Sequence, residues 1–127
     1  SVIEVVRKEL LTPYGLRTLS PNHHDYKPFY EGDQPTRDMA YHNGTVWPWL
    51  LQPFCTAYLN LNKKSGLPLV KSIYEGFESI MTDYGIGTIC EIFDGDPPHH
   101  PRGAISQAWS VGALLYIGKL IENFEKE

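Results

Sequence analysis

Residues 45–63 read TVWPWLLQPFCTAYLNLNK, and this stretch decides the predicted fold class. Its apolar residues recur at the three- and four-residue spacing of an amphipathic helix. They are Val46, Trp49, Leu50, Phe54, Ala57, Tyr58 and Leu61. Pro48 suits the first turn of a helix, where backbone N–H groups have no partner inside the helix. The stretch therefore predicts a helix over residues 45–63.

The segment that follows predicts a second helix, packed against the first. Residues 68–84 carry an apolar stripe that ends at Tyr84, and Gly85 comes next as a C-terminal cap. The link Lys64-Ser65-Gly66 is short. We therefore expect the two helices to form an antiparallel hairpin.

Helices are also predicted at the two ends of the chain. Residues 2–11 form a short helix that stops before Thr12-Pro13, because a proline disfavours helical geometry at the preceding residue. Residues 104–124 are apolar on nearly every face as far as Ile117, so the first half of this helix should be buried. Four helices and no repeated strand pattern predict an all-α fold, with residues 1–127 as a single unit.

Composition excludes several classes of protein. Eleven Lys and Arg against fifteen Asp and Glu give a formal net charge of -4, without a basic stripe that could neutralise phosphates. No apolar run approaches the roughly 20 residues that span a bilayer. Nucleic acid and membrane are therefore not expected partners. Cys55 and Cys90 are too few for a disulfide framework or a closed zinc site, which favours a cytoplasmic protein.

Two long connections separate the predicted helices. Residues 12–44 and 85–103 exceed the roughly 2–8 residues that usually join packed helices. Both are rich in Asp, His, Pro and Gly, which make fixed turns and present polar groups beside aromatic ones. Long ordered loops on a helical scaffold usually carry function, so we expect the functional site in these two loops.

The end of the first loop combines groups that bind sugars. Residues 33–49 read DQPTRDMAYHNGTVWPW. Sugars need flat aromatic faces for their C–H surfaces and fixed polar groups for their hydroxyls, so this mixture favours a sugar-binding cleft. In the alternative interpretation Trp47 and Trp49 are core anchors, and Arg37 with Asp38 is a surface pair. Composition does not decide between the two.

Glu91 is the candidate acidic group of the second loop. Residues 89–93, ICEIF, predict a short extended segment in which Ile89, Glu91 and Phe93 point the same way. Glu91 would then lie among apolar neighbours, an environment in which active sites tune an acid or a base. The alternative is a buried structural ion pair between Glu91 and an arginine. The arginines considered are Arg17, Arg37 and Arg102.

Two clusters contain residue types that bind metals. They are residues 94–100, DGDPPHH, and His23-His24-Asp25. Neither has the spacing of a calcium loop or a zinc site. The sequence also has no Gly-rich phosphate loop, nucleophile elbow or Cys/His constellation, which excludes phosphoryl and acyl transfer. We therefore predict no metal and no cofactor.

Five short sequence motifs (sequence words) resemble those of a known family. They are YGLRTLS at residues 14–20, YEGDQ at 30–34, RDMAYHNGTVWPWLL at 37–51, EIFDGDPPHHPRG at 91–103 and QAWS at 107–110. Together they resemble the C-terminal portion of the microbial amylo-α-1,6-glucosidase type of glycogen debranching enzyme. The resemblance covers about residues 11–111, and the words occur in the family's order.

The resemblance implies a fold and a site. The family's catalytic domain is an α/α toroid of six helical hairpins, so the chain would hold its last few helices as a partial toroid. The EIFDG word places the general base at Glu91. The general acid would lie upstream, outside this sequence. The same matching puts further residues in the glucose pocket: Arg37, Asp38, His42, Trp47, Trp49, Gln107 and Trp109.

The implied reaction is hydrolysis, with inversion, of α-1,6-linked glucosyl stubs on glycogen-like glucans. Expected partners are the α-glucan substrate and the missing upstream part of the catalytic domain, without which the chain should be inactive. Exposed apolar helix faces would also favour self-association. Two alternatives stay open: a non-catalytic carbohydrate-binding or interaction module on the same scaffold, and a trehalase-like or glucoamylase-like hydrolase.

The sequence departs from the family pattern at a few positions. Pro35 follows the Asp33-Gln34 pair where the resemblance leads us to expect Trp, so an aromatic contact with substrate should be missing there. Gln52 replaces an expected small residue, and residues 111–116 diverge after the QAWS word. These differences affect the predicted substrate preference more than the predicted reaction class.

Overall fold

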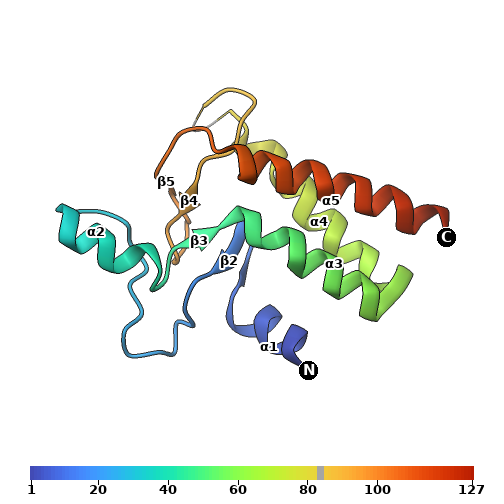
Figure 1. Cartoon of the computed structure of the whole chain (residues 1–127), viewed down its shortest axis with the longest axis horizontal. Helices are drawn as coiled ribbons and strands as arrows, with labels where there is room; N and C mark the ends of the chain where they lie inside the picture. Colours follow the sequence, from blue (N-terminus) through green and yellow to red (C-terminus); the bar gives the residue numbers. More distant parts are fainter. Residues whose placement is uncertain (83–84) are drawn as a thin grey trace.

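The computed structural model describes residues 1–82 and 85–127 and contains both helices and strands (Figure 1). The helices are α1 (Val2–Glu9), α2 (Gln34–Tyr41), α3 (Leu51–Asn62), α4 (Leu67–Gly76) and α5 (Ala108–Lys126). The strands are β1 (Leu11–Thr12), β2 (Gly15–Arg17), β3 (Val46–Trp47), β4 (Ile92–Phe93) and β5 (Pro101–Arg102). Three short 3-10 helices accompany them: η1 (Pro48–Leu50), η2 (Lys63–Gly66) and η3 (Glu78–Ile80).

A five-stranded antiparallel sheet makes the all-α prediction wrong, and with it the partial toroid as a purely helical fold. The strands lie in the order β1-β2-β3-β4-β5. Each strand has only two or three residues. A segment that short cannot show the alternation of apolar and polar residues by which strands are recognised in a sequence. The correct class is a helical fold with a small sheet.

Strand β3 lies in the middle of the sheet and joins the two long loops. Trp47 is in register with Leu16 of β2, and Val46 is in register with Phe93 of β4. Both residues of β3 are buried, so its two neighbours are fixed by packing as well as by backbone hydrogen bonds. The predicted loops are thus paired with one another through this sheet.

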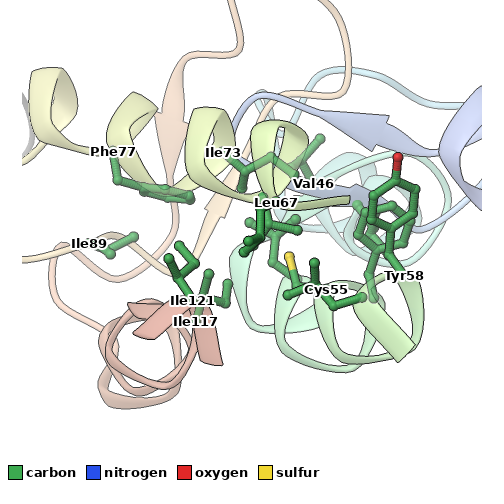
Figure 2. Packing of buried hydrophobic residues seen from close by; sticks show 14 of the residues in the cluster. Val46, Cys55, Tyr58, Leu67, Ile73, Phe77, Ile89, Ile117 and Ile121 are labelled. Atoms are coloured by element: carbon green, nitrogen blue, oxygen red, sulfur yellow. The ribbon is translucent and has the colours of Figure 1, made fainter. Parts of the chain in front are cut away.

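The hydrophobic core lies between the sheet and helices α3, α4 and α5 (Figure 2). Helix α5 packs against both α3 and α4, and η2 connects α3 to α4 where a short link was predicted. Figure 2 shows Cys55 of α3, Ile73 of α4 and Ile117 of α5 directed into the same core. Cys55 and Cys90 are buried, and burial raises the pKa of each thiol to about 12. Both thiols are therefore protonated and unreactive at neutral pH.

The predicted helices differ from the observed ones mainly at their ends. The helix predicted over residues 45–63 is strand β3, then η1, and becomes an α-helix only at Leu51. The helix predicted over residues 68–84 is α4, which already ends at Gly76, a residue with low helix propensity. Gly85 therefore does not cap this helix as predicted. The predicted end at Tyr84 lies outside the described residues.

Helix α5 begins at Ala108 instead of residue 104, and it buries one stripe of side chains. The stripe is Ser110, Ala113, Ile117, Ile121 and Phe124. Leu115 and Tyr116 are exposed, so the first half of the helix is not buried on all faces as expected. In the part of the chain that the structure describes, no helix is long and apolar enough to cross a membrane.

Helix α2 lies inside the segment predicted to be a loop. The side chain of Asp33 accepts a hydrogen bond of 3.0 Å from the backbone N–H of Thr36, and Pro35 lies in the first turn. Both are standard signals for a helix start. In Figure 1 helix α2 lies on the opposite side of the strands from α3, α4 and α5.

The two long loops meet where backbone passes against backbone. The N–H of Gly95 in the second loop donates to the carbonyl of Pro28 in the first (2.6 Å), and within the first loop the N–H of Lys27 donates to the carbonyl of Asn43 (2.7 Å). A Cβ atom at Gly95 would lie only 2.3 Å from the carbonyl oxygen of Gly44. Glycine is therefore required at residue 95 for this approach.

We predict that Gly95→Ala lowers the free energy of unfolding by about 1–3 kcal/mol, because the added methyl group must push the loops apart. Gly112→Ala is the matched control, since a Cβ atom there meets nothing within 4 Å. In helix α5 that change should be neutral or stabilising by up to about 1 kcal/mol. Urea unfolding measures both variants, and equal stability of the two would contradict the close approach.

Candidate active site

Glu91 lies immediately before β4, and both of its carboxylate oxygens have hydrogen-bond donors. The Tyr41 hydroxyl donates to Oε1 at 2.5 Å, and the Ala104 backbone N–H donates to Oε2 at 3.3 Å. The side chain is half-buried, whereas Ile89 and Phe93 on either side are fully buried. Glu91 is thus a fixed carboxylate at the edge of the core. The extended segment predicted over residues 89–93 is a strand only at Ile92–Phe93, and Cys90 and Ile92 are buried like Ile89 and Phe93, so the predicted alternation is not observed.

The arginines considered as structural partners of Glu91 have contacts elsewhere. Arg102 forms an ion pair with buried Asp94, with Nη2 2.9 Å from Oδ2. Arg17 donates from Nε to the carbonyl of Gly95 at 2.9 Å. Arg37 donates to backbone and side-chain oxygens at the start of its own helix. The buried acidic group with a guanidinium partner is therefore Asp94, which the sequence reasoning did not single out for this role.

Tyr41, at the end of α2, connects Glu91 to an aromatic cluster. Its ring lies 4.7 Å from that of Trp47 and 4.9 Å from that of His42, both in edge-on geometry. Burial, together with the hydrogen bond to Glu91, raises the pKa of the Tyr41 phenol above its ordinary value. The phenol therefore remains a proton donor at neutral pH. Sequence reasoning missed Tyr41 because its direction depends on α2, which was not predicted.

Four of the predicted sugar-binding residues surround one pocket of about 270 Å³. Its lining is Thr18, His42, Trp47, Trp49, Leu50 and Trp109. The rings of Trp49 and Trp109 stack at 5.5 Å, and Trp109 also meets Trp47 edge-on at 6.0 Å. Thr18 and Leu50 are lining residues that the sequence reasoning did not identify. Glu91 is not part of the lining and is linked to it through Tyr41.

The three tryptophans differ in exposure, and Trp47 and Trp49 fit different interpretations made from the sequence. Trp47 is buried, and its indole N–H donates to the carbonyl oxygen of Tyr41 at 3.0 Å, so it is a core anchor. Trp49 and Trp109 are 36% and 49% exposed and present flat apolar surface to the pocket. Exposed indole faces of this kind can contact the C–H face of a sugar ring.

The remaining predicted pocket residues do not line this pocket. Arg37 and Asp38 are both hydrogen-bonded to Gln34 along α2, with distances of 2.8 and 2.6 Å. They therefore form part of a surface network, as the alternative interpretation held for this pair. Gln107 is the N-cap of α5, and its backbone N–H donates to the carbonyl of Ile89 at 3.0 Å. It holds α5 beside the segment that carries Glu91.

A larger groove of about 540 Å³ lies between α4 and the second half of α5 and contains no predicted site residue. Within the described residues, the ligand atoms of His23, His24 and Asp25 come within 4.8 Å of one another. All three side chains are exposed. Asp94, in the other cluster considered for metal binding, is bound to Arg102.

Comparison with known proteins identifies the family. A model of the amylo-α-1,6-glucosidase family matches residues 1–116 of the chain. The chain belongs to this family. The resemblance read from the five sequence words is therefore confirmed, and the match extends beyond the residues that carry those words.

A curated relative supports the same family. The glycogen debranching enzyme of Saccharomyces cerevisiae is 32% identical over 69 residues, which cover 50% of this chain and 4% of the yeast protein. The chain thus spans only a small part of the length of that relative. This member of the amylo-α-1,6-glucosidase family is related to glycogen debranching enzymes.

We predict that Tyr41 stays protonated in the pH range near 10 where exposed tyrosines ionise, because its surroundings raise its pKa. A raised pKa means that the protonated phenol stabilises the folded state, and that this contribution is lost as pH rises from about 10 through the folded-state pKa. Ultraviolet absorbance titrations of the folded wild type and Tyr41→Phe should coincide up to about pH 11. If the Tyr41→Phe titration instead lacked one phenol that ionises in the wild type with a midpoint near pH 10, the burial and hydrogen bonding of Tyr41 would be contradicted.

Proposed function

We propose that this chain supplies the general base and part of the glucose pocket of an inverting glycoside hydrolase that cleaves α-1,6-glucosidic branch stubs of glycogen-like glucans. The family relationship supports the reaction class. The observation that carries the proposal is the Glu91 carboxylate, hydrogen-bonded to Tyr41, whose ring contacts Trp47 in the lining of the aromatic pocket. Glycoside hydrolysis uses two carboxyl groups that flank the scissile bond, and Glu91 would supply one of them.

In the proposed step, Glu91 accepts a proton from a water molecule while the water oxygen attacks the anomeric carbon. The glycosidic C–O bond breaks at the same time, and its oxygen takes a proton from a general acid. One proton thus passes to Glu91 and one leaves the acid, so charge balances. In inverting enzymes the two carboxyl groups are about 6.5–9.5 Å apart, which leaves room for the water.

The general acid would come from a part of the protein outside this sequence. The match covers 4% of the length of the yeast relative, so most of the sequence of such a protein lies outside the matched segment. The isolated chain is accordingly proposed to be inactive. Its contribution is the base and one wall of the pocket, where Trp49 and Trp109 would contact the glucosyl ring.

We predict that Glu91→Gln in the complete enzyme lowers kcat for an α-1,6-glucosidic substrate by at least about 100-fold, because the amide cannot accept the proton of water. The side chain keeps its size, so the fold should stay intact. Glu122→Gln is the matched control: Glu122 is exposed in an ion pair with Lys119, which contributes little to stability. Normal turnover by Glu91→Gln would remove Glu91 from this role.

One observation favours a second function, a non-catalytic carbohydrate-binding module. The aromatic pocket is complete without Glu91, so it could bind sugar independently of any reaction. Titration of isomaltose into the complete protein and its Glu91→Gln and Trp109→Ala variants distinguishes the two functions. Binding that needs Trp109, together with hydrolysis that is absent even in the wild type, would favour the module. Trp109 is preferable to Trp47 for this test, because Trp47 is a core residue.

A further inference from the structure

The hydrogen bond between Tyr41 and Glu91 crosses from one long loop to the other. Tyr41 ends α2, and Glu91 precedes β4, fifty residues later in the chain. The oxygen–oxygen distance is 2.5 Å, at the lower end of the usual range for a hydroxyl that donates to a carboxylate. A charge-assisted bond of this kind fixes the direction of the carboxylate as well as its distance.

The opposite side of the carboxylate is closed by backbone. The Ala104 N–H donates to Oε2, and the backbone N–H of Glu91 donates in turn to the carbonyl of Ala104 at 2.9 Å. A Cβ atom at Gly103 would lie 2.4 Å from Oε2. The carboxylate therefore cannot swing towards β5, and its rotation is limited mainly by the phenol on the other oxygen.

Tyr41 is itself held in place by hydrogen bonds to its backbone and by contacts of its ring. Its carbonyl oxygen accepts hydrogen bonds from the Trp47 indole (3.0 Å) and the Thr45 hydroxyl (2.7 Å). Its ring contacts those of Trp47 and Tyr30, with centroid distances of 4.7 and 5.6 Å. The phenol is thus positioned by the same tryptophan that forms the floor of the aromatic pocket.

We propose that Tyr41 is a positioning residue that orients the Glu91 carboxylate towards the attacking water. This inference rests on the proposed function of Glu91 as general base. Each carboxylate oxygen has two acceptor sites, so one bond from Tyr41 and one from Ala104 leave sites for water. Because Tyr41 is hydrogen-bonded to the base and does not line the aromatic pocket, its loss should affect the chemical step and leave substrate binding unchanged.

Tyr26 offers a matched control within the same chain. Its hydroxyl donates to Oδ1 of Asp96 at 2.9 Å, and its pKa is raised to about 12, first by burial and then by that hydrogen bond. Tyr26→Phe therefore removes the same kind of phenol–carboxylate bond, at a place where neither residue belongs to the proposed machinery. A merely structural role for these bonds would make the two substitutions equivalent.

The test measures kcat, KM and the melting temperature of Tyr41→Phe, Tyr26→Phe and Glu91→Gln in the complete enzyme. Tyr41→Phe should lower kcat by about 10- to 100-fold with KM changed less than about twofold, because a misaligned base slows only the chemical step. Tyr26→Phe should leave both constants within about twofold of the wild type. This split between kcat and KM is the expected result.

Four results would overturn the inference, and they separate it from the proposed function. If Tyr41→Phe has a normal kcat while Glu91→Gln is inactive, the positioning role of Tyr41 is rejected and Glu91 keeps its role as general base. Equal losses of activity and melting temperature in the two Tyr→Phe variants, or failure of Tyr41→Phe to fold, would assign the phenol a structural role. Turnover by Glu91→Gln would reject the proposed function itself, and the role of Tyr41 with it.

Discussion

The two-residue strand β3 is the constraint on which the rest of the structure depends. Val46 is fully buried and Trp47 nearly so, and the strand pairs with β2 on one side and β4 on the other. Through η1 it leads directly into α3, and through the Trp47 indole it holds the end of α2. One short segment thus fixes the helical core, the sheet and both long loops relative to one another.

This constraint explains how a site can be built from loops and still be rigid. Glu91 and Tyr41 come from different loops, and their hydrogen bond forms because β3 and β4 are paired beside them. Gly95 and Gly103 lie where any side chain would meet backbone or the Glu91 carboxylate. Groups held in this way lose little further entropy when a substrate binds, which is the physical advantage of a preorganised active site.

The sequence predicted what depends on long periodic patterns and missed what depends on short segments. The stripes of α3 and α5 are long enough to show helical spacing, although their first turns were misplaced. The strands are too short to show alternation, so the sheet was not predicted. Helix α2 has a recognisable start at Asp33 and Pro35, but it lies in a polar segment that resembles a loop. Glu91 was identified from its sequence word, whereas Tyr41 could not be, because its direction depends on a helix that was missed.

The most direct measurement of the central claim is a crystal structure of the complete protein with a non-hydrolysable α-1,6-linked glucosyl ligand. We expect a glucosyl ring against Trp49 and Trp109, with a water bound to Glu91 at about 3–3.5 Å from the anomeric carbon. A ligand bound at a different surface, with the Glu91 carboxylate directed away from the sugar and without a water between them, would contradict it.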